Sequence, residues 1–278
     1  GQSTASRRCP SRHDSSWTVE LDGAAAVRAR RVVLAAGAVQ TPALLQRSGV
    51  RRHVGSTLRM HPMAKITAVF PDVVNRDGMG VGVHQMKELG PAVQLGCSIS
   101  SPGYLAMALA ELPRARPMID AGWEHMATYY TSNAAGSGRV VAVPGLRDPL
   151  VTFTVGRSGA AELVDGLRVL GRCLLDAGAE QLIVGAHGAA PVADYDALDG
   201  FLATLAPGAL ALMTVHLAGS CPMGAVARCP VDSWGRVKGA YGLYVNDASV
   251  LCGAPTVNPQ GSIMAVAHRN VLHLLDEM

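Results

Sequence analysis

The chain has 278 residues, of which 49% are hydrophobic and 16% are charged, and its formal net charge is +3. This composition is typical of a globular protein and excludes an intrinsically disordered chain. The length is enough for one large core or two moderate ones. The basic residues are scattered rather than gathered into a stripe, so nucleic-acid binding is not expected.

The six cysteines form no C-x-x-C pair, so neither a zinc ribbon nor a redox motif is predicted. His216, Cys221 and Cys229 show no recognised zinc spacing, and no metal site is expected. Six cysteines without a paired motif in a chain of this length are typical of reduced thiols, which predicts a cytoplasmic protein. The polar, arginine-containing start of the chain has no apolar core and predicts no signal peptide.

The first predicted elements are two strands. Residues 1 to about 15 show no periodicity, which predicts an irregular start. Residues 17–21 alternate as a strand, and the Asp22-Gly23 pair after them is a turn signal. Residues 31–36 are apolar after the first position, which predicts a strand buried on both faces.

This second strand runs into a glycine turn and a helix. Thr41 is the predicted N-cap, Pro42 takes the first helical position and Gly49 lies past the end. A strand, a glycine turn and a helix in this order can present backbone N–H groups to a ligand. The candidate cofactor-binding residues of the turn are Ala36, Gly37 and Ala38.

Residues 56–205 predict a second domain of antiparallel sheet and helices. Four runs in or beside it read as strands: 65–70, 93–99, 126–130 and 151–155. A long helix is predicted from Ser158 or Gly159, with leucines at helical spacing and an end near Gly178.

One run, residues 201–219, is apolar and approaches the length of a membrane span. Pro207-Gly208 interrupts it and His216 lies inside it, so no span is predicted. The expected structure is a helix over 201–206, a break, and a buried strand over 210–215.

The C-terminal stretch, residues 216–264, contains the residues that best suit a chemical site. A short apolar strand, residues 243–245, ends in Asn-Asp, and Asn258-Pro259 opens a predicted helix over 260–276. The helix carries one apolar stripe that is expected to pack inward: Ile263, Ala267, Val271, Leu274 and Leu275.

Small residues in this stretch let the backbone approach a large flat ligand. His216 supplies a base near neutral pH, and Asn258 supplies an uncharged polar group. The stretch therefore indicates a pocket in which a cofactor ring and an alcohol meet. The competing interpretation of a lone histidine is a buried core residue.

Two segments carry a family resemblance. One reads RVVLAAGAVQTPALLQRSGV (31–50) and continues as VGSTLRMHP (54–62). The other comprises HLAGSCPMG (216–224), VDSWGRVKGAYGLYVNDAS (231–249) and PTVNPQGSIMA (255–265). In content and order they resemble conserved segments of the glucose-methanol-choline (GMC) oxidoreductases, which are FAD-dependent alcohol oxidases and dehydrogenases. The middle of the chain has no matching motif, but the layout of its residue pattern most resembles long-chain-alcohol oxidase and cholesterol oxidase-like members.

The resemblance assigns roles to particular residues. His216 matches the histidine that takes the alcohol proton during hydride transfer, and Asn258 matches the second active-site position. Asp247 and Ala248 match the pair that contacts FAD, and Pro259 begins the helix whose positive end faces the flavin. The competing interpretation of Asn258-Pro259 is a simple helix start. Two positions depart from the family pattern, Asn246 and Pro222.

The family opens with a strand, a G-x-G-x-x-G turn and a helix that hold the ADP part of FAD, and this sequence contains no such unit. The predicted fold class is therefore α/β (mixed α+β): a partial FAD-binding Rossmann-like domain without its first βαβ unit, plus an antiparallel substrate domain. Residues 1–55 and 206–278 are assigned to the FAD-binding domain and residues 56–205 to the substrate domain. FAD is expected to bind weakly or not at all to the chain alone.

Two functions remain open from the sequence. The chain is the substrate-side part of an FAD-dependent alcohol oxidoreductase, completed by an N-terminal piece that lies on a partner chain or outside the given sequence, or it is a non-catalytic remnant or binding module. Whether it is an enzyme by itself is left undecided. The Leu-, Met- and Ala-rich middle favours an apolar alcohol, although ordinary core packing needs the same residues.

Overall fold

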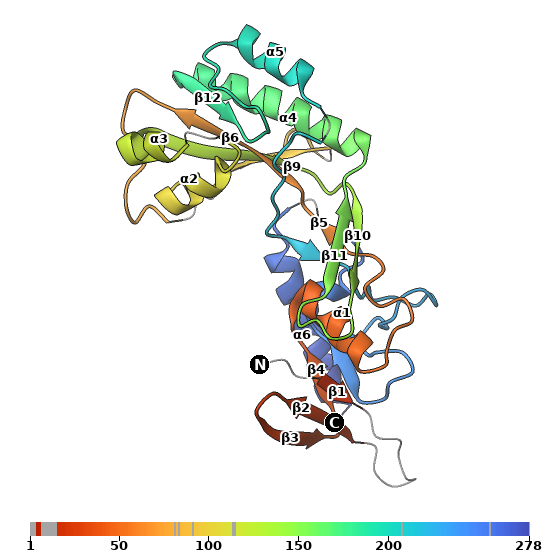
Figure 1. The fold of residues 1–278 in the computed structure, drawn as a ribbon. Helices are drawn as coiled ribbons and strands as arrows, with labels where there is room; N and C mark the ends of the chain where they lie inside the picture. Colours follow the sequence, from red (N-terminus) through yellow and green to blue (C-terminus); the bar gives the residue numbers. More distant parts are fainter. Residues whose placement is uncertain are drawn as a thin grey trace. The chain divides into compact units, whose positions relative to one another are not determined.

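The computed structural model describes residues 4–6, 16–80, 82, 84–90, 92–112, 115–206, 208–255 and 257–277. The chain divides into two compact units, each assembled from separate stretches (Figure 1). Unit 1 comprises Gly1–Met60, Gly136–Thr154 and Val215–Met278, and unit 2 comprises His61–Ala135 and Val155–Thr214. These bounds differ from the predicted ones, because residues 56–60 and 136–154 belong to unit 1 and residues 206–214 belong to unit 2.

Unit 1 begins with a three-stranded antiparallel sheet, β1 (Thr4–Ser6), β2 (Trp17–Leu21) and β3 (Ala24–Ala29). The predicted strand and the turn after it are confirmed by β2. The strand β3 was not predicted, because its sequence AAAVRA does not alternate. The predicted irregular start lies largely outside the described residues, and its described part, Thr4–Ser6, pairs with β2.

The strand β4 (Val32–Leu34) pairs in parallel with β14 (Leu243–Val245), so the two strands, each predicted separately, belong to one sheet. Val245 is fully buried in the core of unit 1, but the side chain of Val33 is 45% exposed. The prediction that β4 is buried on both faces is therefore wrong for this chain. The physical reason is that the face from which Val33 projects is not covered by another element among the described residues, since side chains project from the faces of a sheet.

The helix α1 (Gly37–Arg47) begins four residues before the predicted N-cap. Pro42 lies inside the helix, and Thr41 is buried instead of capping it. The predicted end is confirmed, since Gly49 follows the helix with φ +86°, a left-handed conformation that glycine adopts without strain.

The helix α6 (Gln260–Asp276) has the predicted bounds, but its predicted inward stripe is wrong in part. Asn270 is its one buried residue among those described, and Val266 packs against the core. Val271 and Leu275 are 40% and 57% exposed. The remaining elements of unit 1 are β5 (Arg59–Met60), β10 (Ser137–Val141), β11 (Leu150–Thr154), β13 (Leu217–Ala218) and the 3-10 turn η2 (Ala248–Val250).

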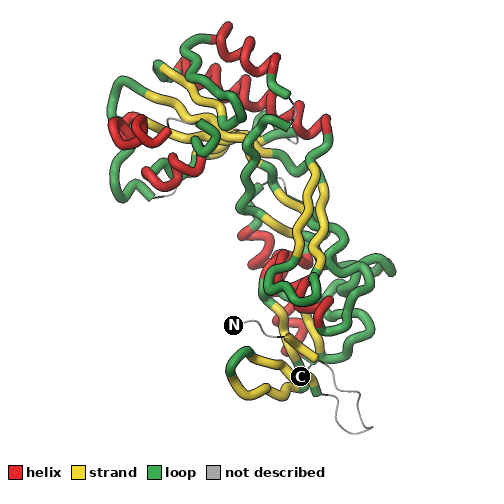
Figure 2. Tube along the Cα trace, viewed as in Figure 1, coloured by secondary structure: helices red, strands yellow, loops and turns green. Residues whose placement is uncertain are grey.

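Unit 2 is a five-stranded antiparallel sheet with helices on both faces, seen as yellow strands between red helices in Figure 2. The strand order is β12 (Gln181–Val184), β6 (Met63–Val69), β9 (Met126–Ser132), β8 (Gln94–Cys97) and β7 (Gln85–Met86). One face packs on α4 (Arg157–Asp176), which lies against α5 (Tyr195–Thr204). The other face packs on α2 (Pro102–Ala108) and α3 (Ala115–Gly122), and the short η1 (Trp123–His125) leads into β9.

The predicted antiparallel runs and the long helix are confirmed in unit 2 and in β11. The predicted strand over residues 210–215 is not regular. Leu210 and Met213 form isolated bridges, to Ala186 and Met63. No helix within the described part of the chain is long and apolar enough to cross a membrane.

Candidate active site

The carboxyl ends of β4 and β14 are joined through one carboxylate, that of Asp247. Its Oδ2 accepts hydrogen bonds from the backbone N–H of Gly37 at 3.0 Å and from Thr41 Oγ1 at 2.5 Å. Its Oδ1 accepts from Ser249 N at 2.7 Å. Two of the predicted cofactor-binding positions, Gly37 and Asp247, therefore lie in direct contact although 210 residues separate them.

Thr41 completes this network. Its hydroxyl donates to Asp247 and accepts from the backbone N–H of Ala36 at 3.1 Å. The sequence suggested an N-cap for this threonine, and its bridging role was missed. A threonine one helical turn after the glycine turn is a weak signal for such a bridge, because its partner is distant in the sequence.

Ala38 does not face the same surface as Gly37. It is 5% exposed and packs in a small core with Leu58, Met60 and Val140. Gly37 has φ +80°, and a Cβ placed on it would meet nothing within 4 Å. The turn therefore offers open backbone at Gly37, and Ala38 anchors it to the core.

The strand that follows His216 is tied to the Asp247 network. Gly219 N donates to Ala248 O at 3.1 Å, and Cys221 N donates to Ser249 O at 2.8 Å. His216 itself is half-buried at the start of β13. The histidine segment and the Asp-Ala pair, which the sequence placed in one site, thus belong to one hydrogen-bonded framework.

Cys221 lies within this framework and is fully buried. Burial, and after it the negative charge of Asp247, raises the pKa of its thiol to about 12. The thiol is therefore held neutral and acts as a packing residue, as expected of a buried cysteine.

Asn258 and Pro259 lie at the start of α6, as predicted. Pro259 is buried and Asn258 is exposed. The first turn of α6 has neither a side-chain cap nor an acidic residue, so its backbone N–H groups and positive dipole end are not neutralised there. At its other side, α6 is bound to β14 by Asn246, whose Nδ2 donates to Ala267 O at 3.1 Å. The departure from the family pattern at Asn246 therefore fastens this helix.

These residues fit part of FAD. The uncapped start of α6 offers N–H donors to an electron-rich ligand, at the carboxyl ends of parallel strands where α/β folds bind nucleotides. The N–H of Gly37 is already bound to Asp247, so the turn at Gly37 contributes open space for a close approach to the backbone and not a donor. The Asp247 carboxylate already accepts three hydrogen bonds, so its first effect is to hold the turn in place.

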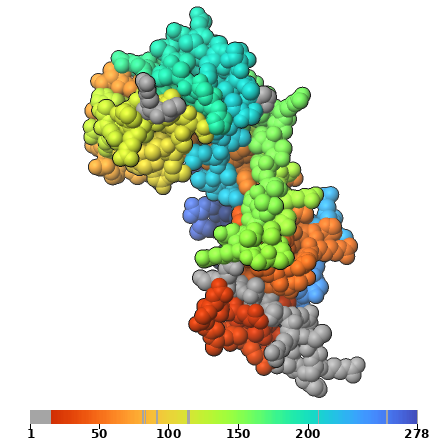
Figure 3. Space-filling view, in the orientation of Figure 1, coloured from red at the N-terminus to blue at the C-terminus, as the bar shows by residue number. Residues whose placement is uncertain are grey.

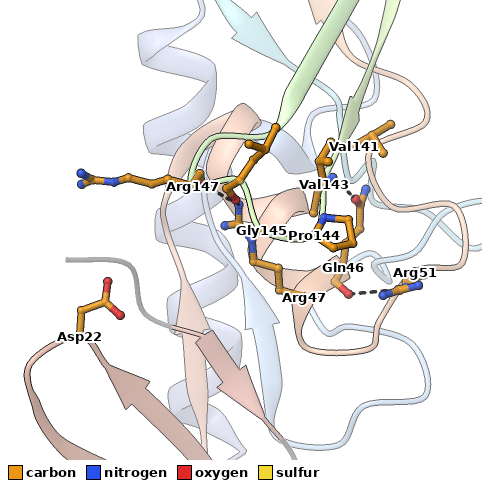
Figure 4. A pocket seen from close by; sticks show the side chains of 11 residues that line it. Asp22, Gln46, Arg47, Arg51, Val141, Val143, Pro144, Gly145 and Arg147 are labelled. Atoms are coloured by element: carbon orange, nitrogen blue, oxygen red, sulfur yellow. Dashed lines mark hydrogen bonds between the residues drawn. The ribbon is translucent and has the colours of Figure 1, made fainter.

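A pocket of about 1140 Å³ in unit 1 contains none of the predicted site residues. It lies between the end of α1 and the loop that joins β10 to β11 (Figure 4). The surface of this loop, green in Figure 3, adjoins the orange surface near α1. Gln46 and Arg47 use their polar groups to hold this loop, because Gln46 Oε1 accepts from Ala142 N at 2.7 Å and Arg47 donates to Arg147 O at 2.7 Å. The pocket is therefore a feature of the loop's attachment. Among the described residues, no group of three or more His, Cys, Asp or Glu side chains is placed to hold a metal ion.

Comparison with known proteins gives consistent results. Two family models described as GMC oxidoreductase match residues 18–63 and 145–267. A GMC-type oxidoreductase of Sinorhizobium fredii is 37% identical over 246 residues, covering 87% of this chain and 49% of the relative. A long-chain-alcohol oxidase of Arabidopsis thaliana is 28% identical, covering 87% of this chain and 35% of the relative. The chain thus spans about half, or less, of the length of these relatives.

Solved structures show the same fold. Pyridoxine 4-oxidase from Mesorbium loti superposes with a TM-score of 0.65 at 19% identity, covering 96% of this chain and 56% of that one. Formate oxidase from Aspergillus oryzae superposes with a TM-score of 0.64 at 16% identity, covering 96% and 59%. The predicted mixed α/β fold is confirmed.

Proposed function

Because this chain belongs to the GMC oxidoreductase family, we propose that it is the substrate-side part of an FAD-dependent alcohol oxidoreductase. Unit 1 is assigned to FAD and unit 2 to the substrate. The observation that supports this most is the Asp247 network, which fastens Gly37, the end of β14 and the histidine segment into one framework.

His216 is the proposed base. An alcohol loses its O–H proton when its carbinol carbon is oxidised, and a positioned imidazole accelerates that step by about 10²–10⁴-fold. Asn258 is proposed to hydrogen-bond the alcohol oxygen and so orient it toward His216. FAD, when bound, supplies the two-electron acceptor for the carbinol hydrogen.

The start of α6 is proposed to stabilise negative charge on the bound cofactor. Its N–H groups are uncapped, and Gln260, Gly261 and Ser262 are exposed. A charge at a helix N-terminus is stabilised by about 0.3–1 kcal/mol at an exposed site. Because the first turn lacks an acidic residue, nothing in it competes for this position.

The FAD site is proposed to be completed by a further polypeptide that supplies the missing βαβ unit. Two surfaces of unit 1 support this. Among the described residues β4 pairs with a strand along one edge alone, and Val33 is exposed on one face, whereas parallel sheets are normally covered on both faces. The exposed side of α6 carries an apolar stripe of Met264, Val271, Leu272 and Leu275, all at least 40% exposed. Exposed apolar stripes of this kind mark interaction surfaces.

The decisive experiment compares the chain alone with the chain co-expressed with the N-terminal part of the Sinorhizobium fredii relative. We expect flavin absorbance at 450 nm, roughly one FAD per complex, only in the co-expressed sample. Stoichiometric yellow chromophore in the chain alone would refute the need for a complementing polypeptide.

The base is tested in the flavin-loaded complex. His216→Ala is expected to lower alcohol turnover by at least about 10²-fold while FAD remains bound. Undiminished turnover would reject His216 as the base. Retained FAD with no alcohol turnover in the parent complex would instead favour the alternative of a non-catalytic binding module.

A further inference from the structure

Residues 54–62, which resemble a conserved family segment, lie beside the segment that carries His216. The strands β5 and β13 are antiparallel and form two residue pairs, Met60 with Leu217 and Arg59 with Ala218. Before β5, the backbone N–H of Gly55 donates to the carbonyl oxygen of Ser220 at 2.7 Å. The first segment is therefore bound along the residues that directly follow His216.

Thr57 adds a side-chain hydrogen bond to this backbone pairing. Its Oγ1 donates to the carbonyl oxygen of Gly219 at 2.7 Å, across 162 residues of sequence. Gly219 is buried, and a buried carbonyl group that lacks a partner is costly. The Thr57 hydroxyl therefore supplies a partner to a group that needs one, and it joins the two segments at the point where the histidine segment bends.

Gly219 forms this bend, and the backbone around it is closely packed. Its φ is +68°, a left-handed conformation that glycine adopts without strain. A Cβ placed on it would lie 3.1 Å from Leu251 O and 3.2 Å from Arg59 Cγ. Its N–H donates to Ala248 O at 3.1 Å. Both backbone polar groups of Gly219 are therefore fixed, the N–H by Ala248 and the carbonyl by Thr57.

The backbone that Thr57 holds sets the position of the His216 ring. His216 directly precedes β13, and β13 and β5 have two residues each, so their backbone pairing alone is short. The bond from Thr57 is therefore a large part of the attachment. A base must lie within hydrogen-bond reach of the proton that it takes, and a displacement of about 1 Å can lower the rate about 10²-fold.

We propose that Thr57 is a positioning residue for His216: its hydrogen bond to Gly219 fixes the backbone from which the imidazole ring projects. The inference rests on the proposed function, in which His216 is the base. It gives residues 54–62 a role in the reaction that requires no contact with the substrate or the cofactor. The hydroxyl of Thr57 takes no part in the proton transfer and acts through His216 alone.

The first test uses the full chain without FAD and measures native-state hydrogen exchange of the Gly219 and Cys221 amides. Thr57→Val removes the hydroxyl, nearly keeps the shape of the side chain, and should speed this exchange about tenfold. Thr57→Ser keeps the hydroxyl and should stay within about twofold of the unmodified chain. The matched control is Ser56→Ala, which removes a neighbouring hydroxyl that donates to His53 O at 2.9 Å, and it should also stay within about twofold. Unchanged exchange in Thr57→Val overturns the proposal.

The second test measures the rate of flavin reduction in the flavin-loaded complex by anaerobic stopped flow, with 1-hexanol and benzyl alcohol as probes. The loss of oxidised-flavin absorbance reports the alcohol half-reaction and needs no electron acceptor. Thr57→Val should lower the limiting rate per bound flavin about tenfold or more, and it should leave the apparent Kd of the alcohol within about twofold. Thr57→Ser and Ser56→Ala should retain the rate of the unmodified complex.

Combination with His216→Ala separates positioning from a general loss of structure. Because Thr57 acts through the imidazole ring, Thr57→Val should change the rate of flavin reduction by less than about twofold once that ring is absent. An equal loss of rate with and without the ring refutes the positioning role. A parent complex whose flavin neither alcohol reduces would instead refute the proposed function. The exchange measurement then decides by itself whether Thr57 holds the histidine segment.

Discussion

Removing the Asp247 carboxylate is expected to release the turn at Gly37. Asp247→Ala deletes three hydrogen bonds, at 3.0, 2.5 and 2.7 Å, from Gly37, Thr41 and Ser249. Water replaces part of each, since Asp247 is half-buried. At about 1 kcal/mol for each bond, the local opening free energy should fall by about 3 kcal/mol.

The assay is native-state hydrogen exchange of the Gly37 and Ser249 amides, which reads this region without requiring the two units to unfold together. A loss of about 3 kcal/mol corresponds to exchange roughly a hundredfold faster. Asp247→Asn should cost less than Asp247→Ala, because the amide oxygen has two lone pairs and can still accept from Gly37 and Thr41, whereas the amide nitrogen cannot accept from Ser249.

The control is Asp148→Ala, which removes an exposed carboxylate of the same unit that accepts a long hydrogen bond from Gln40 Nε2 at 3.5 Å. It should change exchange at Gly37 by less than about twofold. Thr41→Val should couple to Asp247→Ala by about 1 kcal/mol in a double-mutant cycle. Unchanged exchange of the Gly37 amide in Asp247→Ala would refute the conclusion that Asp247 holds this turn in place.

Three further outcomes are expected. Cys221 should resist iodoacetamide until unit 1 unfolds. The pKa of its thiol is raised from 9.0 to about 12 in the folded protein, so its contribution to stability is complete below pH 9 and is lost as the pH rises toward 12. Cys221→Ala should therefore reduce the alkaline loss of stability measured in urea titrations. Gly55→Ala should destabilise by about 2 kcal/mol more than Gly145→Ala: both glycines have positive φ, but a Cβ at Gly55 would lie 2.3 Å from a backbone oxygen and one at Gly145 meets nothing. Equal costs would contradict this close approach. The double variant Met264→Lys, Leu275→Lys should have an unfolding free energy within about 0.5 kcal/mol of that of the unmodified chain, because both side chains are exposed. It should weaken association with the complementing polypeptide at least about tenfold in pull-down titrations.

Elements with a strong local pattern could be predicted from the sequence. The strand β14, the long helix α4 and the bounds of α6 follow from periodicity and from turn residues beside them. The start of α1 could not be placed, because Thr41 is held by Asp247, 206 residues away, and not by its own helix. A local pattern contains no information about such a partner.

The candidate site was predicted to a similar extent. Family resemblance placed Gly37 and Asp247 in one site, and their hydrogen bond places them side by side. It did not single out Thr41 or Ser249, which share the carboxylate. The burial of Lys65 could not be predicted either, since β6 pairs with β9, a strand distant in the sequence.

The division of each unit into separate stretches has a consequence for synthesis on the ribosome. The chain passes between the units four times, and unit 2 is complete once residue 214 has emerged. The strand β4 must then wait for β14, and Gly37 for Asp247, 210 residues later. At about 5–20 residues per second this delay is about 10–40 s, during which β4 lacks the partner that β14 provides. Nascent chains stalled before residue 243 should therefore bind chaperones through β4, and release them when β14 emerges.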